Sequence, residues 1–518
     1  LDGFEVTAAA TASVCAPTEV TIRALAADGT TYTGFTGPVD ISTSSNHGNW
    51  SSSGFGTLIP STDSNDDGAV QYSFAAGDNG QVVLNLSNTH ADELTVTATE
   101  SGGTATGVSS VIAFNENALQ INVTDTLGND FIAGRNHALE VEMLRLDPVS
   151  GSCGRFEEYQ GDIDLKAWIT RSTNDAGGVA PEVTGVGGDV SLPSATPGAD
   201  NLTLNFVQGL ASTQLLTSDV GQYALNLTDD SSGLVLDINN QPITINASSA
   251  DYTVRPFAFY LLATTQRATP TSNPAATSAA GSAFIKAGET FDLMARAVVH
   301  QGVDDSNDDG VADAGADLSD NAATPAFGNE GESVSLSSTL LLPSPSLAGV
   351  VDPGLAGATT ISAFSSGAGT ASVRFDEVGI IQLDAQLQSG SYLGSSNVTG
   401  AIDYVGRFYP DQFLISDDGP QLRDGNDDVS PWTCDFTYQG QGFGFVSEPS
   451  ITVTAVNVLG ATTNNYGGAF WSLPLPQHTI ELDSASPATG SACLDGVGGI
   501  AAGCFTGNSS SVTRSWTG

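Results

Sequence analysis

An aspartate-rich hexamer, Asp-Ser-Asn-Asp-Asp-Gly, occurs twice in the chain, at residues 63–68 and 305–310. In the second copy, oxygen-bearing side chains recur at the spacing of a calcium-binding loop, with a glycine at the sixth position for the sharp turn. The candidate ligands are Asp305, Asn307, Asp309 and Asp313. The glutamate that closes an EF-hand loop is absent. We therefore expect a structural calcium ion here, with backbone carbonyls or water completing its shell.

The same residues fit an alternative without an ion. Asx side chains hydrogen-bond to nearby backbone groups, so each hexamer could be an Asx-rich turn that satisfies its own loop. The first copy offers Asp63, Asn65 and Asp67 as calcium ligands but lacks an acidic residue at the ninth position. In both interpretations the role of the loops is structural.

Side chains that commonly carry catalysis are scattered. The histidines stand singly, without a metal-ligand spacing, at positions 47, 90, 137, 300 and 478. A nucleophile elbow, a phosphate-binding loop and a dinucleotide fingerprint are absent from the sequence. One acidic group could imitate the paired carboxylates of a glycoside hydrolase, namely Glu157, Glu158, Asp162 and Asp164. Because neighbours on a strand face opposite ways, a solvated strand face is the better interpretation, and we predict that the chain is not an enzyme.

Tryptophans offer a further kind of site. Trp50 stands in an expected loop beside the first hexamer, and Trp432 and Trp471 lie near the C-terminal end. If exposed, they would mark a carbohydrate or protein site. Trp168, in the alternating run DIDLKAWIT, is expected in the core.

Charge restricts the partners. Among 518 residues, 58 are acidic and 14 are basic, which gives a formal net charge of -44. Nucleic acids and anionic membrane surfaces are excluded, because neutralising phosphate requires clustered Lys and Arg. Salt or bound divalent cations would screen the self-repulsion of such a chain, which favours a saline or calcium-bearing exterior over the cytosol.

Cysteine usage also favours the exterior. The five cysteines, at positions 15, 153, 434, 493 and 504, lack metal-site spacing, so we expect disulfides formed outside the cytoplasm. Cys493 and Cys504 enclose a short Gly-rich loop and form a good local pair. The other three leave an odd thiol, and a bridge from Cys15 to Cys153 across a domain junction is one of the pairings open to them. No stretch has the apolar length of a membrane span, so we expect no direct membrane insertion.

The elements that position these residues are strands. Apolar residues, 40% of the chain, come in short Val/Ile/Leu/Phe runs separated by Gly, Ser, Thr, Asn and Asp. A chain of this length exceeds one core and predicts about three to five domains.

Internal repeats set the architecture. Residues 78–86, 219–227 and 377–383 share the form acidic-x-Gly-x-aromatic/aliphatic-x-Leu. In an immunoglobulin-like sandwich such a segment fits strand F, with Tyr223 as the corner tyrosine and Leu225 facing the other sheet. We therefore predict an all-β chain of tandem immunoglobulin-like β-sandwich domains.

A second repeat joins the two ends of the chain. Residues 29–37 align without a gap to residues 460–468, and the opening strands at 2–6 and 411–415 also correspond. The predicted domains are an Ig-like sandwich at 1–112, a sandwich at 113–253, a sandwich with the Asp-rich loop at 254–404, and an Ig-like sandwich at 405–518 that is either divergent or cut short.

Two similar junction runs, TVRPFAF and VGRFYPDQF, contain Arg255 and Arg407. In a chain so poor in positive charge, we expect these arginines to clamp carboxylates or carbonyls between neighbouring domains. An ordinary surface position is the alternative.

Many of these runs together resemble a known family. Starting from CGRFEEYQGDIDLKAWITR, they continue through LTSDVGQYALNLTDDSSG, TVRPFAF, NDDGVAD, LSDNAATPAFGNE, DEVGIIQL and VGRFYPDQF to CDFTYQGQGF and TTNNYGG. In this order they look like the MshQ-like proteins linked to biogenesis of mannose-sensitive haemagglutinin pili. The resemblance covers roughly residues 110–470, and the preceding residues are similar to the Ig-like domain that comes before this region in such proteins.

The resemblance implies a protein exported to a pilus or cell surface of a Gram-negative bacterium. We expect a non-catalytic, pilus-associated adhesin or stalk, extracellular, whose partner is a cell-surface glycan or protein receptor. The alternative is a structural filament or surface-layer subunit that polymerises with neighbouring subunits through domain edges. A polysaccharide hydrolase comes third.

Overall fold

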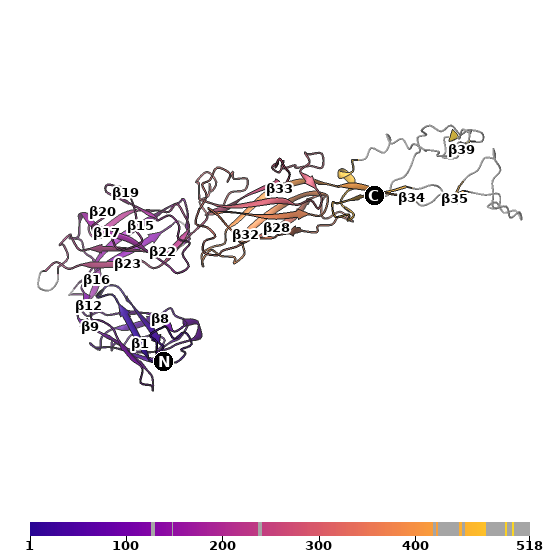
Figure 1. Cartoon of the computed structure of the whole chain (residues 1–518). Coiled ribbons are helices and arrows are strands. Elements are labelled where there is room, and N and C mark those ends of the chain that lie inside the picture. The colour runs from indigo at the N-terminus through magenta and orange to yellow at the C-terminus, as the bar shows by residue number, and fades with distance from the viewer. Residues whose placement is uncertain are drawn as a thin grey trace.

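The computed structural model describes residues 1–125, 130–147, 149–236, 241–417, 421–422, 445–447, 451–472, 493–494 and 500–501. Within these residues the regular structure is strand, accompanied by two short 3-10 helices, η1 (Ala76–Asp78) and η2 (Gly468–Phe470). Figure 1 shows strand-rich bodies in chain order, with the second and third end to end and the first beside the second. The predicted all-β, Ig-like tandem fold is confirmed.

The first domain is a two-layered sandwich with a small third sheet. One layer has the order β1 (Gly3–Ala8), β3 (Thr18–Leu25), β8 (Gln81–Ser87), β5 (Asn49–Ser52). The other has the order β11 (Thr106–Val108), β10 (Val96–Glu100), β4 (Pro38–Thr43), β7 (Ala69–Ser73), β6 (Thr57–Ile59). The small sheet comprises β2 (Thr11–Ser13), β12 (Ile112–Asn115) and β9 (Glu93–Leu94). Strict alternation of exposed and buried residues along β4 shows why its sequence forms a half-buried strand.

The second domain is a sandwich of two six-stranded sheets. Its first sheet has the order β13 (Asn117–Thr124), β15 (Asn136–Asp147), β21 (Leu210–Leu216), β18 (Glu182–Gly185), β19 (Gly188–Ser191), with β16 (Ser152–Arg155) paired to β15. Its second has the order β14 (Phe131–Ile132), β24 (Tyr252–Arg255), β22 (Gly221–Asp229), β17 (Gly161–Arg171), β20 (Leu202–Phe206), with β23 (Ile245–Ser248) paired to β22.

The third domain repeats the plan. One sheet has the order β25 (Ala258–Thr265), β27 (Phe291–Val298), β31 (Ala368–Phe375), β29 (Leu355–Gly357). The other has the order β26 (Ile285–Lys286), β33 (Thr399–Tyr409), β32 (Gly379–Leu387), β28 (Val334–Leu342), β30 (Thr360–Ile361). Beyond it, the described strands form the pairs β34 (Gln412–Asp417) with β37 (Ile451–Val456), β35 (Gln421–Leu422) with β36 (Phe445–Ser447), and β38 (Cys493–Leu494) with β39 (Ile500–Ala501).

The three acidic-x-Gly segments occupy equivalent places. They lead into β8, β22 and β32, each of which has strands on both sides in its sheet. Leu225 on β22 is fully buried in the core, as predicted, and Tyr223 packs edge-on against Tyr252 at 4.7 Å between ring centroids.

The repeat between the ends of the chain is also real in three dimensions. Gly3 pairs with Leu25 in the first domain as Gln412 pairs with Val456 after the third. The bridge Leu25–Thr31 has its counterpart in Val456–Thr462. One sequence pattern therefore builds the same strand pair and turn twice.

The buried apolar cores do not correspond one to one with the domains. The first domain has a core of its own, whereas one continuous cluster of buried side chains extends through the second and third domains. A smaller cluster joins Val378 and Ile380 of the third domain to Ala455, Tyr466 and Phe470 of the following segment. The second and third domains, and the third domain and the segment after it, are thus joined by apolar packing.

Candidate functional site

The second Asp-rich hexamer lies in the long connection between β27 and β28, against the second domain. Asp305 is buried, and its two carboxylate oxygens accept hydrogen bonds from the backbone N–H groups of Asp309 and Gly310, each at 2.9 Å. Asp308 has a φ of 58° and Gly310 a φ of 76°, so the loop turns through two left-handed residues. The carboxylate of Asp313 accepts from the Ser306 N–H at 2.9 Å. This is the Asx turn of the alternative interpretation.

The first hexamer adopts the same turn. Asp66 and Gly68 have φ values of 54° and 68°, which match those of Asp308 and Gly310. The Asn65 amide donates to Asp67 at 2.8 Å, as Asn307 donates to Asp309 at 2.8 Å in the second copy. The hexamer therefore encodes its conformation locally.

The calcium prediction stays a prediction for both loops. Among the described residues, one group of His, Cys, Asp and Glu side chains brings its ligand atoms within 4.8 Å of one another: His300, Asp305 and Asp308. Asp309 and Asp313, which we predicted as ligands with Asp305, are outside this group. His300 was missed by sequence reasoning, because a lone histidine five residues before the hexamer matches no ligand spacing.

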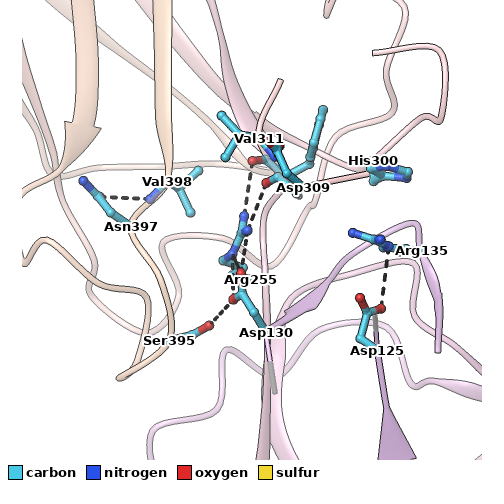
Figure 2. A network of polar contacts seen from close by, with 12 residues as sticks. Asp125, Asp130, Arg135, Arg255, His300, Asp309, Val311, Ser395, Asn397 and Val398 are labelled. Carbon is cyan, nitrogen blue, oxygen red and sulfur yellow. Dashed lines mark hydrogen bonds and ion pairs between the residues drawn. The ribbon is translucent and has the colours of Figure 1, made fainter. Parts of the chain in front are cut away.

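Arg255 holds the second and third domains together. It is 3% exposed, and its Nε and Nη2 atoms donate to both carboxylate oxygens of Asp130 at 2.7 to 3.1 Å. Nη2 also donates to the carbonyl of Gly310 at 3.0 Å, within the Asp-rich loop. Figure 2 shows the guanidinium between Asp130 and this loop. The predicted clamp is thus present at Arg255, whereas the Nε of Arg407 donates to the Gly281 carbonyl of its own domain.

The Asp130 carboxylate has a third partner. Ser395, from the connection before β33, donates to it at 2.7 Å. Burial opposes ionisation, but the hydrogen bonds from Arg255 and Ser395 and the charge of Arg255 hold the pKa of Asp130 below its ordinary value. Asp130 is therefore anionic where it joins the two domains.

A second ionic cluster lies beside the first. The Nδ1 atom of His137 is 2.6 Å from Asp125, and both side chains are almost fully buried. Burial lowers the pKa of His137 despite the favourable carboxylate of Asp125. Arg135 lies 3.6 Å from Asp125 and 2.5 Å from Asp308 of the Asp-rich loop. Arg135 thus links the second domain to that loop.

In two of the three copies of the acidic-x-Gly repeat, the acidic residue forms hydrogen bonds with the domain or segment that follows. Asp219 of the second domain accepts the backbone N–H of Ala326 in the third at 3.2 Å, besides those of Val179 and Val220. Burial raises the pKa of Asp219 although these groups donate to it. In the first domain, the equivalent Asp78 accepts from Phe55 and Ala75 within its own domain.

Glu377 repeats the contact at the end of the third domain. It accepts the backbone N–H groups of Asn464 and Asn465, at 2.7 and 3.1 Å, from the repeated turn after β37. Lys286 donates to Asp411 at 2.7 Å across the same boundary. The sequence repeat signalled these acidic residues but not their distant partners.

A disulfide connects the first and second domains. Cys15 and Cys153 are bonded, with their Cα atoms 5.6 Å apart. The Asn246 side chain adds a hydrogen bond to Thr11 at 3.0 Å. The predicted Cys493–Cys504 pair lies outside the described residues, because neither Cys504 nor the side chain of Cys493 is described.

Two tryptophan predictions were wrong. Trp50 is 2% exposed and donates through its indole nitrogen to the Gly68 carbonyl at 3.0 Å, so it fills the core beneath the hexamer and does not face a ligand. Trp168 is half-buried on the face of β17 opposite the core residues Leu165 and Ile169. The phase of the alternation was misassigned there. Trp471 packs against Tyr466, and Trp432 lies outside the described residues.

The acidic group that could have imitated a hydrolase is exposed, as expected. Asp162 and Asp164 lie on the outward face of β17, where they accept hydrogen bonds from Asn205 and Thr203 of β20. Each carboxylate thus forms a hydrogen bond between neighbouring strands on the outer face of the sheet.

A cavity of about 540 Å³ opens in the third domain next to the Asp-rich loop. Asp313, Asp384 and Asp403 line it together with Arg255. Such a wall, rich in hydrogen-bond acceptors, suits a ligand that carries hydroxyl or ammonium groups.

Comparison with known proteins identifies a family. Three models of one family, described as a domain of unknown function, DUF6701, match consecutive parts of the chain: its first Ig-like domain at residues 100–239, its second domain at 255–374 and its third at 377–511. No protein of curated function matches the chain.

Several solved structures share local likeness. The D0–D1 domain of intimin is 11% identical, covers 48% of this chain and 97% of its own, and has a TM-score of 0.18. FdeC, an Escherichia coli adhesin, is 14% identical over 77% of this chain and 96% of its own, with a TM-score of 0.21. The titin fragment I67–I69 is 9% identical over 77% and 95%, also at 0.21. TM-scores this low bear neither on domain arrangement nor on binding. No helix long and apolar enough to cross a membrane occurs in the described residues.

Proposed function

Since the chain belongs to the DUF6701 family, we propose that it is a non-catalytic protein of the bacterial surface, in which tandem Ig-like domains form a stiff, pilus-associated stalk of the MshQ-like kind. The stalk holds a receptor-binding surface away from the cell, and the receptor is a surface glycan or protein. One observation carries this proposal: successive domain boundaries are fixed by specific contacts.

The contacts recur in the same form. At the end of the second domain, Asp219 accepts a backbone N–H from the third, and at the end of the third domain, Glu377 accepts two from the next segment. Backbone N–H donors cannot swing away as side chains do, so a carboxylate bonded to them fixes the angle between domains as well as their contact.

Apolar packing and covalent bonding support the same conclusion. Buried side chains are continuous across the boundary between the second and third domains. The disulfide Cys15–Cys153 joins the first and second domains covalently and fits an oxidising exterior. An acidic surface of net charge -44 keeps such an extended chain soluble in saline surroundings.

The proposal is tested by the shape of the purified chain in solution. Small-angle X-ray scattering should give a narrow distribution of elongated shapes. Glu377→Ala should broaden this distribution, because it removes the contacts with Asn464 and Asn465. Asp78→Ala is the matched control: it removes an equivalent carboxylate that is bonded within the first domain, and should leave the boundaries between domains unchanged. A wild-type curve typical of freely jointed domains would contradict the stalk.

A second candidate is a filament or surface-layer subunit. It is favoured by uncovered sheet edges in the second domain, since β16 is exposed along its length and β19 along most of it. Electron microscopy of concentrated protein distinguishes the two: filaments would support the subunit, whereas monomers that bind glycans or cells would support the stalk.

A further inference from the structure

We propose that His300, Asp305 and Asp308 form a site for a divalent transition metal such as Zn²⁺ at the boundary between the second and third domains. The proposal goes beyond the stalk function and does not depend on it. It also differs from the calcium loop expected from the sequence, since it uses a histidine outside the hexamer and leaves out Asp309 and Asp313.

The environment of the His300 side chain points to a metal. The His300 side chain is 10% exposed, and its Nε2 atom is buried without a hydrogen-bond partner. The residue is held in place on both its backbone and its side chain. The backbone N–H of His300 donates to the Ala133 carbonyl at 2.7 Å, and the Phe257 ring packs edge-on against the imidazole with 5.0 Å between ring centroids. A buried ring nitrogen without a partner is costly unless something binds it.

The distances fit a shared ion. Nε2 of His300 lies 3.3 Å from Oδ2 of Asp305, and Asp308 has a carboxylate oxygen within 4.8 Å of both. In tetrahedral zinc coordination, with bonds of about 2.0 to 2.1 Å, two ligand atoms are separated by about 3.3 to 3.4 Å. The first two ligands are thus at the required separation. The Asp308 side chain is 53% exposed, and its carboxylate, which lies 2.5 Å from Arg135, would have to turn toward the ion to become the third ligand.

The hydrogen bonds of Asp305 are compatible with this role. Its oxygens accept from the backbone N–H groups of Asp309 and Gly310, which fix the carboxylate beside His300. Each carboxylate oxygen has two lone pairs, so Oδ2 can accept from Gly310 and also bind an ion. Such outer-shell donors commonly orient a metal ligand.

Charge favours a cation here. The loop from residue 304 to residue 313 contains five carboxylates, whereas Arg135 and Arg255 are the cationic side chains shown in contact with it. Figure 2 shows His300 beside the Arg255 and Arg135 networks. One nitrogen and two carboxylate ligands, with water in the remaining position, suit zinc and related transition metals, whereas calcium prefers an all-oxygen shell of six to eight atoms.

The test is calorimetric titration of the chelator-treated full chain with Zn²⁺, with and without excess Ca²⁺. We expect one site that excess Ca²⁺ does not displace. His300→Gln and Asp308→Asn should each weaken it by at least roughly 10-fold, since loss of even an outer-shell partner costs roughly 10–100-fold in metal affinity. His90→Gln, which alters the histidine 3.6 Å from Asp66 of the first hexamer, is the matched control and should bind as the wild type does.

Folding is checked by circular dichroism of each metal-free variant. Asp308 is half-exposed, so Asp308→Asn keeps the test informative even if His300→Gln perturbs the core. Absence of Zn²⁺ binding would overturn the proposal. So would wild-type affinity in both variants, or binding of Ca²⁺ alone that Asp309→Ala abolishes and His300→Gln leaves intact, because that result would establish the calcium loop instead.

Discussion

Residues that join the second and third domains illustrate how buried charge is tolerated. A buried arginine without partners would cost several kcal/mol, so Arg255 is satisfied by the Asp130 carboxylate and by the carbonyls of Pro256 and Gly310. Breaking this pair leaves an unpaired charge in place, whereas the exposed pair of Arg267 with Glu289 contributes little. Ionic contacts at the boundary therefore act chiefly as fixed geometry.

The buried side chain of His137 should make the stability of the folded chain depend on pH. Burial lowers the pKa of this histidine in the folded chain, so the ring takes up a proton more readily when the chain is unfolded. Its contribution is present above the unfolded pKa of about 6.5 and is lost as the pH falls, by at most about 1.4 kcal/mol per pH unit. Denaturant unfolding at pH 7 and pH 5 should show a smaller loss of stability in His137→Gln than in the wild type. Equal losses in the two proteins would contradict this.

At the scale of elements, short sequence patterns specify turns and strand starts repeatedly. The hexamer forms one turn in two domains, and residues 29–37 and 460–468 form equivalent turns after equivalent strands. These structures close their hydrogen bonds within a few residues, so their sequences suffice to determine them. The outcome was less predictable for Trp50, whose burial depends on the opposite sheet.

A substitution at Gly68 tests how strictly the turn of the first hexamer is specified. It has a φ of 68°, and a Cβ there would lie 1.9 Å from the Thr43 hydroxyl, so Gly68→Ala combines backbone strain with a clash. Gly102, with a φ of 77° and open space around it, is the matched control, and its substitution by Ala should cost about 1 kcal/mol from strain alone. Gly68→Ala should cost roughly 1 to 3 kcal/mol more in the free energy of unfolding. Equal values in denaturant titrations would show that the turn yields freely.

The whole molecule contains boundaries of two kinds. From the second domain onward, neighbouring parts share buried apolar clusters and carboxylate contacts with the backbone, whereas the first domain has a separate core and a disulfide. Apolar packing resists bending at many points, but a disulfide with a few hydrogen bonds is a single attachment. The boundary after the first domain should thus be the one that depends on redox conditions.

Reduction should accordingly loosen one boundary selectively. The variant Cys15→Ser with Cys153→Ser should broaden the distribution of distances between spin labels placed on the first and second domains. Labels on the second and third domains should be unaffected. Reductant should reproduce the effect in the wild type and add nothing in the variant. Unchanged distances between the first pair of labels would show that noncovalent contacts suffice there.

Sequence alone determined the all-β fold, the repeated central strands and the conformation of the Asp-rich turns, because alternation, glycine placement and Asx hydrogen bonds act over a few residues. It also indicated Arg255, through the scarcity of positive charge. Tertiary structure decided the rest. Asp130 meets Arg255 at a separation of 125 residues and Ser395 at 265. Partners so far apart are brought together by the packing of whole sheets, which local residue patterns do not encode.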